Sequence, residues 1–159
     1  MSRSLFTAAL LLASGAFADA ARDVKEARAL NEAFARAGSI PDPTESVAAV
    51  AALFVDDMKH IGVFGVVNGK AELIKTITPP FNAPNRKVEL VSNEGTSLDK
   101  DVVMTIAKFK NSFSGPDGKE VMLNLRCVRT MKRQADGKFL IVAEHTSVAV
   151  PLPQPPPSK

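Results

Sequence analysis

The sequence is poor in the residues that build several common kinds of site. It has no tryptophan or tyrosine, a single cysteine, Cys127, and two histidines, His60 and His145, among 159 residues. A single cysteine has no internal disulfide partner, and two histidines so far apart do not match the spacing of common zinc sites. Glycine-rich phosphate loops and the G-x-S-x-G sequence of serine hydrolases are also missing. We therefore expect no metal ion and no cofactor.

Charge of one sign is not in large excess either. The chain has 20 lysines and arginines against 17 acidic residues, and the basic residues are scattered rather than clustered. This distribution does not predict a surface that binds nucleic acid. With 45% apolar residues, the chain has enough material for one hydrophobic core and too little for two. We expect one domain.

No apolar run is long enough to cross a membrane, but a short run lies near the N-terminus. Arg3 precedes an apolar stretch from Leu5 to Ala13, and Ala16-Phe17-Ala18 has the small residues of a cleavage site. A membrane-spanning helix needs about 20 apolar residues. The pattern predicts a secretory signal peptide over residues 1–18, with a second possible cleavage after Ala20. The protein is then periplasmic or secreted and has no membrane anchor.

An amphipathic helix is expected directly after this segment. From Arg22 to Ala37, apolar residues recur every three or four positions, and Asn31 lies on or beside this stripe. A polar residue at such a position either satisfies a buried hydrogen bond or contacts a ligand. Gly38 is expected to end the helix as a C′ glycine.

Two further helices are predicted. Asp42-Pro43-Thr44-Glu45 combines an N-cap acid, a proline in the first turn and a glutamate at the third helical position. That second helix is expected to end at Asp56-Asp57. The third follows Asn68-Gly69 and should stop before Pro79-Pro80, because proline cannot donate a helical hydrogen bond.

Strands make up most of the remaining chain. A short strand is expected from Met58 to Phe64, with His60, Gly62 and Phe64 on the same face as Met58. Two longer strands are expected over residues 87–96 and 102–113. Helices followed by antiparallel strands predict an α+β fold. The proline-rich residues 151–159 should form a disordered tail.

The most informative stretch is the apolar and β-branched segment from Glu120 to Pro151. Asp136-Gly137 in its middle favours a type I′ turn and predicts a long antiparallel hairpin. If the loop has two residues, counting back from it places Arg129 opposite Glu144, and likewise Cys127 opposite Thr146 and Val128 opposite His145. A one-residue bulge would change this register.

Alternation along the two strands separates an apolar face from a mixed one. The apolar face has Arg129, Glu144 and Thr146, together with Val142. The mixed face has Ile141 and His145, and it suits solvent or a second subunit. A guanidinium on an apolar face needs an anion, so Arg129 either pairs with Glu144 or binds the carboxylate of a ligand.

Several of these segments resemble the SnoaL-like branch of the nuclear transport factor 2-like (NTF2-like) superfamily. The resemblance rests on the hairpin segments around Arg129 to Met131, Asp136 to Phe139 and His145 to Ser147. Residues 29–58 and 68–74 are similar to the opening helices of that superfamily. The resemblance implies a domain over residues 21–150, with three N-terminal helices packed in a strongly curved antiparallel sheet that forms a cone.

The resemblance also implies an internal cavity as the functional site. Its expected contents are Asn31, His60, Phe64, Arg129, Glu144 and Thr146, which would bind a small-molecule ligand. Steroid isomerases of the superfamily have a tyrosine, a carboxylate base and a protonated aspartate, and an approximate match places these at Asn31, Gly62 and Arg129 here. The isomerase acid–base set is thus absent.

Three functions remain open at this point. The first is binding of a small, mostly apolar ligand, with Arg129 available for a carboxylate. The second is an acid–base enzyme of the cyclase, dehydratase or isomerase kind, with His60 as catalytic base. His60 could equally be satisfied by a backbone carbonyl. The third is an oligomerising module, and a homodimer through the outer face of the sheet is expected in any case.

Overall fold

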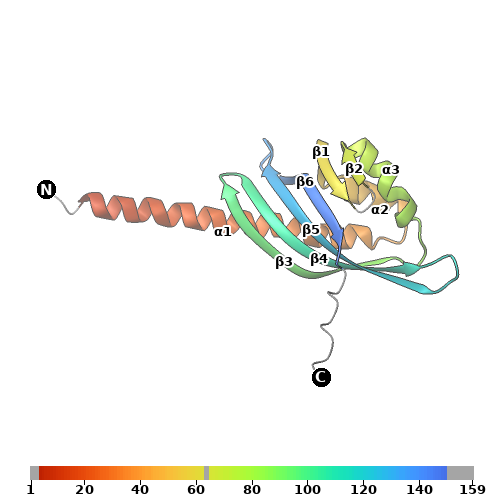
Figure 1. The fold of residues 1–159 in the computed structure, drawn as a ribbon. Helices are drawn as coiled ribbons and strands as arrows, with labels where there is room; N and C mark the ends of the chain where they lie inside the picture. Colours follow the sequence, from red (N-terminus) through yellow and green to blue (C-terminus); the bar gives the residue numbers. More distant parts are fainter. Residues whose placement is uncertain (1–3, 63–64, 150–159) are drawn as a thin grey trace, which may run out of the picture.

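In the part of the chain that the structure describes, a mixed six-stranded sheet and three helices form an α+β fold (Figure 1). The computed structural model describes residues 4–62 and 65–149. Their order is α1 (Ser4–Gly38), α2 (Pro43–Ala51), β1 (Phe54–Gly62), β2 (Gly65–Asn68), α3 (Lys70–Phe81), β3 (Lys87–Asp99), β4 (Val102–Ser114), β5 (Glu120–Arg133) and β6 (Phe139–Val148). Phe64 and the proline-rich tail lie outside the described residues.

The strands are ordered β2-β1-β6-β5-β4-β3. The prediction of a wholly antiparallel sheet is wrong at one place, because β1 pairs with β6 in parallel. Parallel neighbours require a long connection between them, and here β2, α3, β3, β4 and β5 lie between the two strands in the chain. The sheet is strongly curved, and the second half of α1 packs along β3 and β4 (Figure 1).

Helix α1 begins well before the predicted amphipathic stretch. It runs without interruption from Ser4 through both predicted cleavage positions, and its N-terminal part projects beyond the sheet (Figure 1). Within the described residues, no helix combines the length and the apolar character needed to cross a membrane.

Gly38 ends α1 as predicted, but for a different physical reason. Its φ is not among the positive values found in the described residues, so it is not a left-handed C′ glycine. A Cβ atom added to Gly38 would lie 2.8 Å from Cγ2 of Val88 on β3. The glycine is needed because the helix end approaches the sheet this closely.

Helix α2 begins as predicted and ends earlier than predicted. Asp42 is its N-cap and accepts a hydrogen bond from the Glu45 amide at 2.8 Å. The helix stops at Ala51 rather than at Asp56, because the following backbone joins the sheet. Leu53 accepts a bond from the Ile141 amide at 2.9 Å, and Phe54 starts β1.

Helix α3 and strand β2 also differ from the prediction. The helix continues through Pro79-Pro80 to the buried Phe81 instead of stopping before the prolines. The Arg86 guanidinium donates to the Phe81 carbonyl, which satisfies the helix end from outside. The four-residue strand β2 was not predicted. Strands β3 and β4 extend slightly beyond the predicted ranges.

The β5–β6 hairpin has the predicted register near the site, although its turn is not the predicted one. The Gln134 amide donates to the Lys138 carbonyl at 2.8 Å, so the loop has three residues rather than two. Gly137 has a φ of 85°, whereas Asp136 is not in the positive-φ region. This combination is typical of a type I turn followed by a glycine bulge, and it shifts the pairing by one residue.

A second irregularity in the same hairpin reverses this shift. Thr130 pairs with Ala143, but Met131 pairs with Ile141, so Val142 is an extra residue in β6. Beyond this bulge the pairs are those predicted, including Arg129 opposite Glu144. Between the bulge and the turn, the β6 side chains lie on the opposite face of the sheet from the one predicted. Ile141 is therefore fully buried, which corrects its assignment to the outer face, while Val142 is only partly buried.

Candidate functional site

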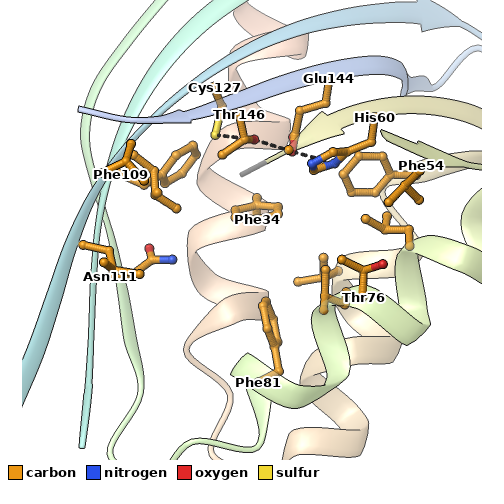
Figure 2. Close-up of a pocket in the computed structure, with 18 of the residues that line it drawn as sticks. Phe34, Phe54, His60, Thr76, Phe81, Phe109, Asn111, Cys127, Glu144 and Thr146 are labelled. Atoms are coloured by element: carbon orange, nitrogen blue, oxygen red, sulfur yellow. Dashed lines mark hydrogen bonds and ion pairs between the residues drawn. The ribbon is translucent and has the colours of Figure 1, made fainter. Parts of the chain in front are cut away.

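A pocket of about 220 Å³ lies between the curved sheet and the helices. Figure 2 shows aromatic side chains from several elements around it, among them Phe34 of α1, Phe54 of β1, Phe81 of α3 and Phe109 of β4. Most of the wall is apolar. The polar side chains that line it are His60, Thr76, Arg86, Asn111, Cys127, Glu144 and Thr146.

The structure divides the predicted site residues into two groups. His60, Glu144 and Thr146 line the pocket. Asn31 and Arg129 are fully buried and are not among the lining residues. Phe64 lies outside the described residues, and His145 is exposed on the outer face, as the alternation predicted.

Arg129 pairs with a protein carboxylate, which decides between the two alternatives left open by the sequence. Its Nε donates to Oε2 of Glu144, and its Nη1 donates to Oδ1 of Asn31 at 2.7 Å. Its guanidinium carbon lies 4.1 Å from the ring centroid of Phe34 and 5.1 Å from that of Phe109. These rings cover the charge with their π faces. Arg129 is therefore part of a buried structural ion pair.

Asn31 connects this ion pair to helix α1 and to the far edge of the sheet. Its Nδ2 donates to Oδ1 of Asn93 at 2.8 Å and to Oγ1 of Thr105 at 3.2 Å. Both Asn31 and Thr105 are fully buried. Of the two roles left open for Asn31, the amide thus satisfies buried hydrogen bonds within the protein and does not contact a ligand in the pocket.

Glu144 is the acceptor at the centre of the network. Oε1 accepts a hydrogen bond from Thr146 Oγ1 at 2.8 Å and lies 3.3 Å from Nδ1 of His60. Burial alone would raise the pKa of this carboxyl. The charges of Arg129 and His60, with the hydrogen bonds from Arg129 and Thr146, outweigh burial and hold the pKa below its usual value. Glu144 is therefore an anion in the folded protein.

His60 presents its imidazole to the pocket between Glu144 and Gly62. Burial lowers its pKa more than the Glu144 carboxylate raises it, and the charge of Arg129 lowers it further. A neutral imidazole is the form that can accept a proton. A Cβ added to Gly62 would lie 2.2 Å from His60 Nε2, so the missing side chain leaves room for the ring.

Cys127 lies at the end of this polar chain. Its sulfur is 3.3 Å from Oγ1 of Thr146, and Figure 2 shows the sequence Cys127, Thr146, Glu144 and His60 along one side of the pocket. Burial, with a further contribution from the Glu144 charge, raises the pKa of the Cys127 thiol to about 11. The thiol is thus a buried, weakly polar group rather than a nucleophile.

Besides Cys127, three polar lining residues were not predicted as site residues from the sequence. Thr76 and Arg86 lie on or just after α3, where no pattern in the sequence pointed to the pocket. Asn111 is different, because it alternates with Phe109 and Phe113 along a predicted strand. Its position on the apolar face could have been found by the same alternation that was applied to the hairpin.

Comparisons with known proteins agree with the architecture. No family model matches the sequence, and no curated protein does. Among solved structures, a ketosteroid isomerase-like protein from Erwinia carotovora atroseptica superimposes with a TM-score of 0.67 at 18% identity, covering 81% of this chain and 98% of the other. A Streptomyces avermitilis protein of the NTF2-like family, provisionally named a dehydratase, gives a TM-score of 0.67 at 17% identity, with 82% and 98% covered.

This chain has the NTF2-like fold. A Novosphingobium aromaticivorans protein, provisionally named an aromatic ring hydroxylase, shares that fold with a TM-score of 0.71 at 20% identity, covering 82% of this chain and 91% of the other. At these identities the likeness establishes the fold alone. Within the NTF2-like fold, the positions matched to the isomerase acid–base set are a buried asparagine, a glycine and an ion-paired arginine.

Proposed function

We propose that the pocket is the internal cavity of an NTF2-like cone and binds a small, mostly apolar molecule. The observation that supports this most directly is the wall itself, which is largely aromatic and aliphatic with few polar groups. An apolar cavity of about 150 Å³ can hold benzene in another protein. A pocket of about 220 Å³ therefore suits a molecule of one or two rings.

The proposed ligand is neutral rather than anionic. Arg129 is engaged with Glu144 and Asn31 and does not line the pocket, so it is not available to a ligand carboxylate. Glu144 does line the pocket and carries a negative charge. A carboxylate placed beside it would be repelled. Of the ligands that the sequence left open, we therefore propose a neutral one and not a carboxylate.

Thermal unfolding followed by circular dichroism tests this proposal. Naphthalene should raise the melting temperature of the protein, and 2-naphthoate, which adds only a carboxylate, should raise it less. Leu125→Trp places a larger side chain into the wall and should abolish both effects. Val128→Trp, on the outer face of the same strand, is the matched control. No shift with either compound would contradict the proposed binding.

A second candidate function is acid–base catalysis of the cyclase, dehydratase or isomerase kind. It is supported by one observation, the position of His60 between the pocket and the Glu144 carboxylate. In this reaction Nε2 of His60 would take a proton from the substrate, and Glu144 would stabilise the imidazolium. Nδ1 of His60 lies 3.3 Å from Oε1 of Glu144, but the two groups are not aligned for a hydrogen bond. Catalytic hydrogen bonds often tighten only in the substrate complex.

Proton exchange provides a test without knowledge of the natural substrate. 2-Tetralone is a neutral two-ring ketone, and the exchange of its α-protons with D₂O can be followed by NMR. Exchange above the buffer rate is expected with the wild type and should be lost in His60→Ala. His145→Ala, on the exposed face, should keep the wild-type rate. An unchanged rate in His60→Ala would remove the catalytic role of His60.

We also propose a homodimer that forms through the outer face of the sheet. This face exposes Ile106 and Met122, whose relative exposures are 37% and 48%. Light scattering at micromolar concentration should give twice the monomer mass, and Met122→Glu should shift it toward the monomer. The proposed periplasmic or secreted location rests on residues 1–18, and N-terminal sequencing of exported protein would show whether they are removed.

A further inference from the structure

We infer that Asn111 binds a hydroxyl group of the ligand and so determines which apolar molecules the pocket accepts. This inference rests on the proposed binding function and adds the chemical class of the ligand. The neutral ring compound proposed above would then also carry the hydroxyl group of an alcohol or a phenol. The supporting residue lies on β4, away from the cluster formed by His60 and Glu144.

Asn111 is a polar side chain in an apolar part of the wall. It lies on the concave face of β4 between Phe109 and Phe113, and it pairs across the sheet with Leu123 of β5. Its Oδ1 is buried and has no hydrogen-bond partner among the described residues. A buried carbonyl without a donor destabilises the folded protein, so such groups are rare in native proteins.

The other two amides near the concave face are satisfied by the protein. Asn31 uses its oxygen for Arg129 and its nitrogen for Asn93 and Thr105. Asn93 also donates to the Arg28 carbonyl at 3.0 Å. These two amides connect helix to sheet, whereas Asn111 has no such role. Its amide lies on the pocket wall (Figure 2), and its Oδ1 has no partner among the described residues.

Asn111 and His60 lie on different sides of the pocket (Figure 2). β6 and β5 separate their strands β1 and β4. At about 4.8 Å per strand, this separation is roughly 14 Å along the sheet, and the curvature brings the side chains closer together. A two-ring molecule is long enough to approach both walls. The ligand can thus place its hydroxyl at Asn111 and its remaining surface against the aromatic residues.

A hydroxyl is the group that fits this amide best. It can donate to Oδ1 and also accept from Nδ2, so it satisfies either end of the side chain. A carboxylate cannot donate, and a hydrocarbon can do neither. An alcohol or phenol should therefore be preferred over the corresponding hydrocarbon by a factor of about ten, the effect of one good hydrogen bond.

The test compares 2-naphthol with naphthalene, which differ only by the hydroxyl group. The chain contains no tryptophan or tyrosine, so the fluorescence of either compound is measured without interference from the protein. In the wild type, 2-naphthol should bind about tenfold more tightly than naphthalene. In Asn111→Leu this preference should fall to about one, with naphthalene still bound. Asn111→Ala provides a second variant in case leucine disturbs the strand.

Asn124→Leu is the matched control, because Asn124 is exposed on the outer face of the neighbouring strand β5. It should keep the wild-type preference. Equal binding of both compounds to the wild type, or a preference that survives in both Asn111 variants, would overturn the inference and leave the binding function intact. Failure of both compounds to bind would overturn the binding function, and the inference with it.

Discussion

Two arginines on the same face of β5, Arg129 and Arg133, show how differently one residue type can act in one strand. The Arg129 side chain is 0% exposed and pairs with a carboxylate that is 4% exposed. Arg133 is 18% exposed at the end of the strand, and two of its three acidic partners, Glu26 and Asp101, are 44% and 38% exposed. One arginine lies behind the pocket, and the other lies at the rim of the sheet.

Their partners differ as well. Arg133 donates to Asp23 at 2.6 Å, to Glu26 at 2.9 Å and to Asp101 at 3.1 Å, and its guanidinium carbon is 4.3 Å from the Phe139 ring centroid. It thereby connects α1 to the β3–β4 and β5–β6 turns. Water competes for these charges but not for those of Arg129. Burial, rather than the number of partners, should therefore decide what each arginine contributes.

The largest effect is expected from breaking the buried pair on one side. Arg129→Met leaves the Glu144 carboxylate buried without its main partner, which should lower the free energy of unfolding by about 3–5 kcal/mol. Urea denaturation at pH 7 measures this. In the double variant Arg129→Met/Glu144→Leu both charges are gone, and the loss should be well below the sum of the two single losses. Strict additivity would show that the two groups do not act as a pair.

The pH dependence of stability should also distinguish the buried cluster around Arg129, which contains His60, from the cluster around Arg133. The pKa of His60 is lowered in the folded protein, so the unfolded chain binds the proton more readily. Stability should be greatest above the unfolded pKa of about 6.5 and should fall as the pH drops from there toward the folded pKa. Urea denaturation at several pH values measures this slope.

His60→Asn should reduce the pH slope between pH 7 and pH 5, whereas His145→Asn should retain it because its His60 is intact. Arg133→Met should retain it as well, since Arg133 belongs to the other cluster. A slope that is the same in His60→Asn as in the wild type would place the titrating group elsewhere in the protein.

A smaller effect is expected from the Arg133 cluster, which is partly exposed. Arg133→Met should lower the free energy of unfolding by less than Arg129→Met does, because Glu26 and Asp101 remain hydrated when the arginine is lost and only Asp23 is buried. The difference in the free energy of unfolding between the wild type and Arg133→Met should be smaller in 1 M NaCl than in 0.05 M NaCl, since salt screens these charges. Denaturation at both salt concentrations tests this. A loss comparable with that of Arg129→Met would contradict the comparison.

The last prediction concerns the reactivity of Cys127 rather than stability. With a pKa of about 11, only about one thiol in a thousand is ionised at pH 8. Alkylation by iodoacetamide should therefore be at least about a hundredfold slower in the native protein than in urea. Arg133→Met should leave this protection unchanged. Loss of the Arg129 charge by itself raises the pKa of the Cys127 thiol further, so Arg129→Met should reduce the protection only by making the destabilised fold open more often. Rapid native alkylation would show that the pocket wall opens readily.

Local stereochemistry made part of this site predictable. Alternation along a strand fixes which side chains share a face, so the sequence placed Arg129 opposite Glu144 and put His145 outside. The turn is not the type I′ turn that Asp136-Gly137 favoured, and the bulge that the sequence left open lies at Val142. Each shifts the register by one residue, in opposite directions. Beyond the bulge the two shifts cancel, and the predicted pairs are correct. Between the turn and the bulge only the first shift applies, so Ile141 was assigned to the wrong face.

The sequence by itself determined the α+β order, the N-cap of α2 and the pairing near the site, because each depends on residues close together in the chain or on simple alternation. Only the tertiary structure decided that Arg129 is covered by Phe34 and bonded to Asn31, which is 98 residues away. It also decided which polar groups line the pocket. These facts depend on how the sheet curves around the helices, and curvature is a property of the whole sheet.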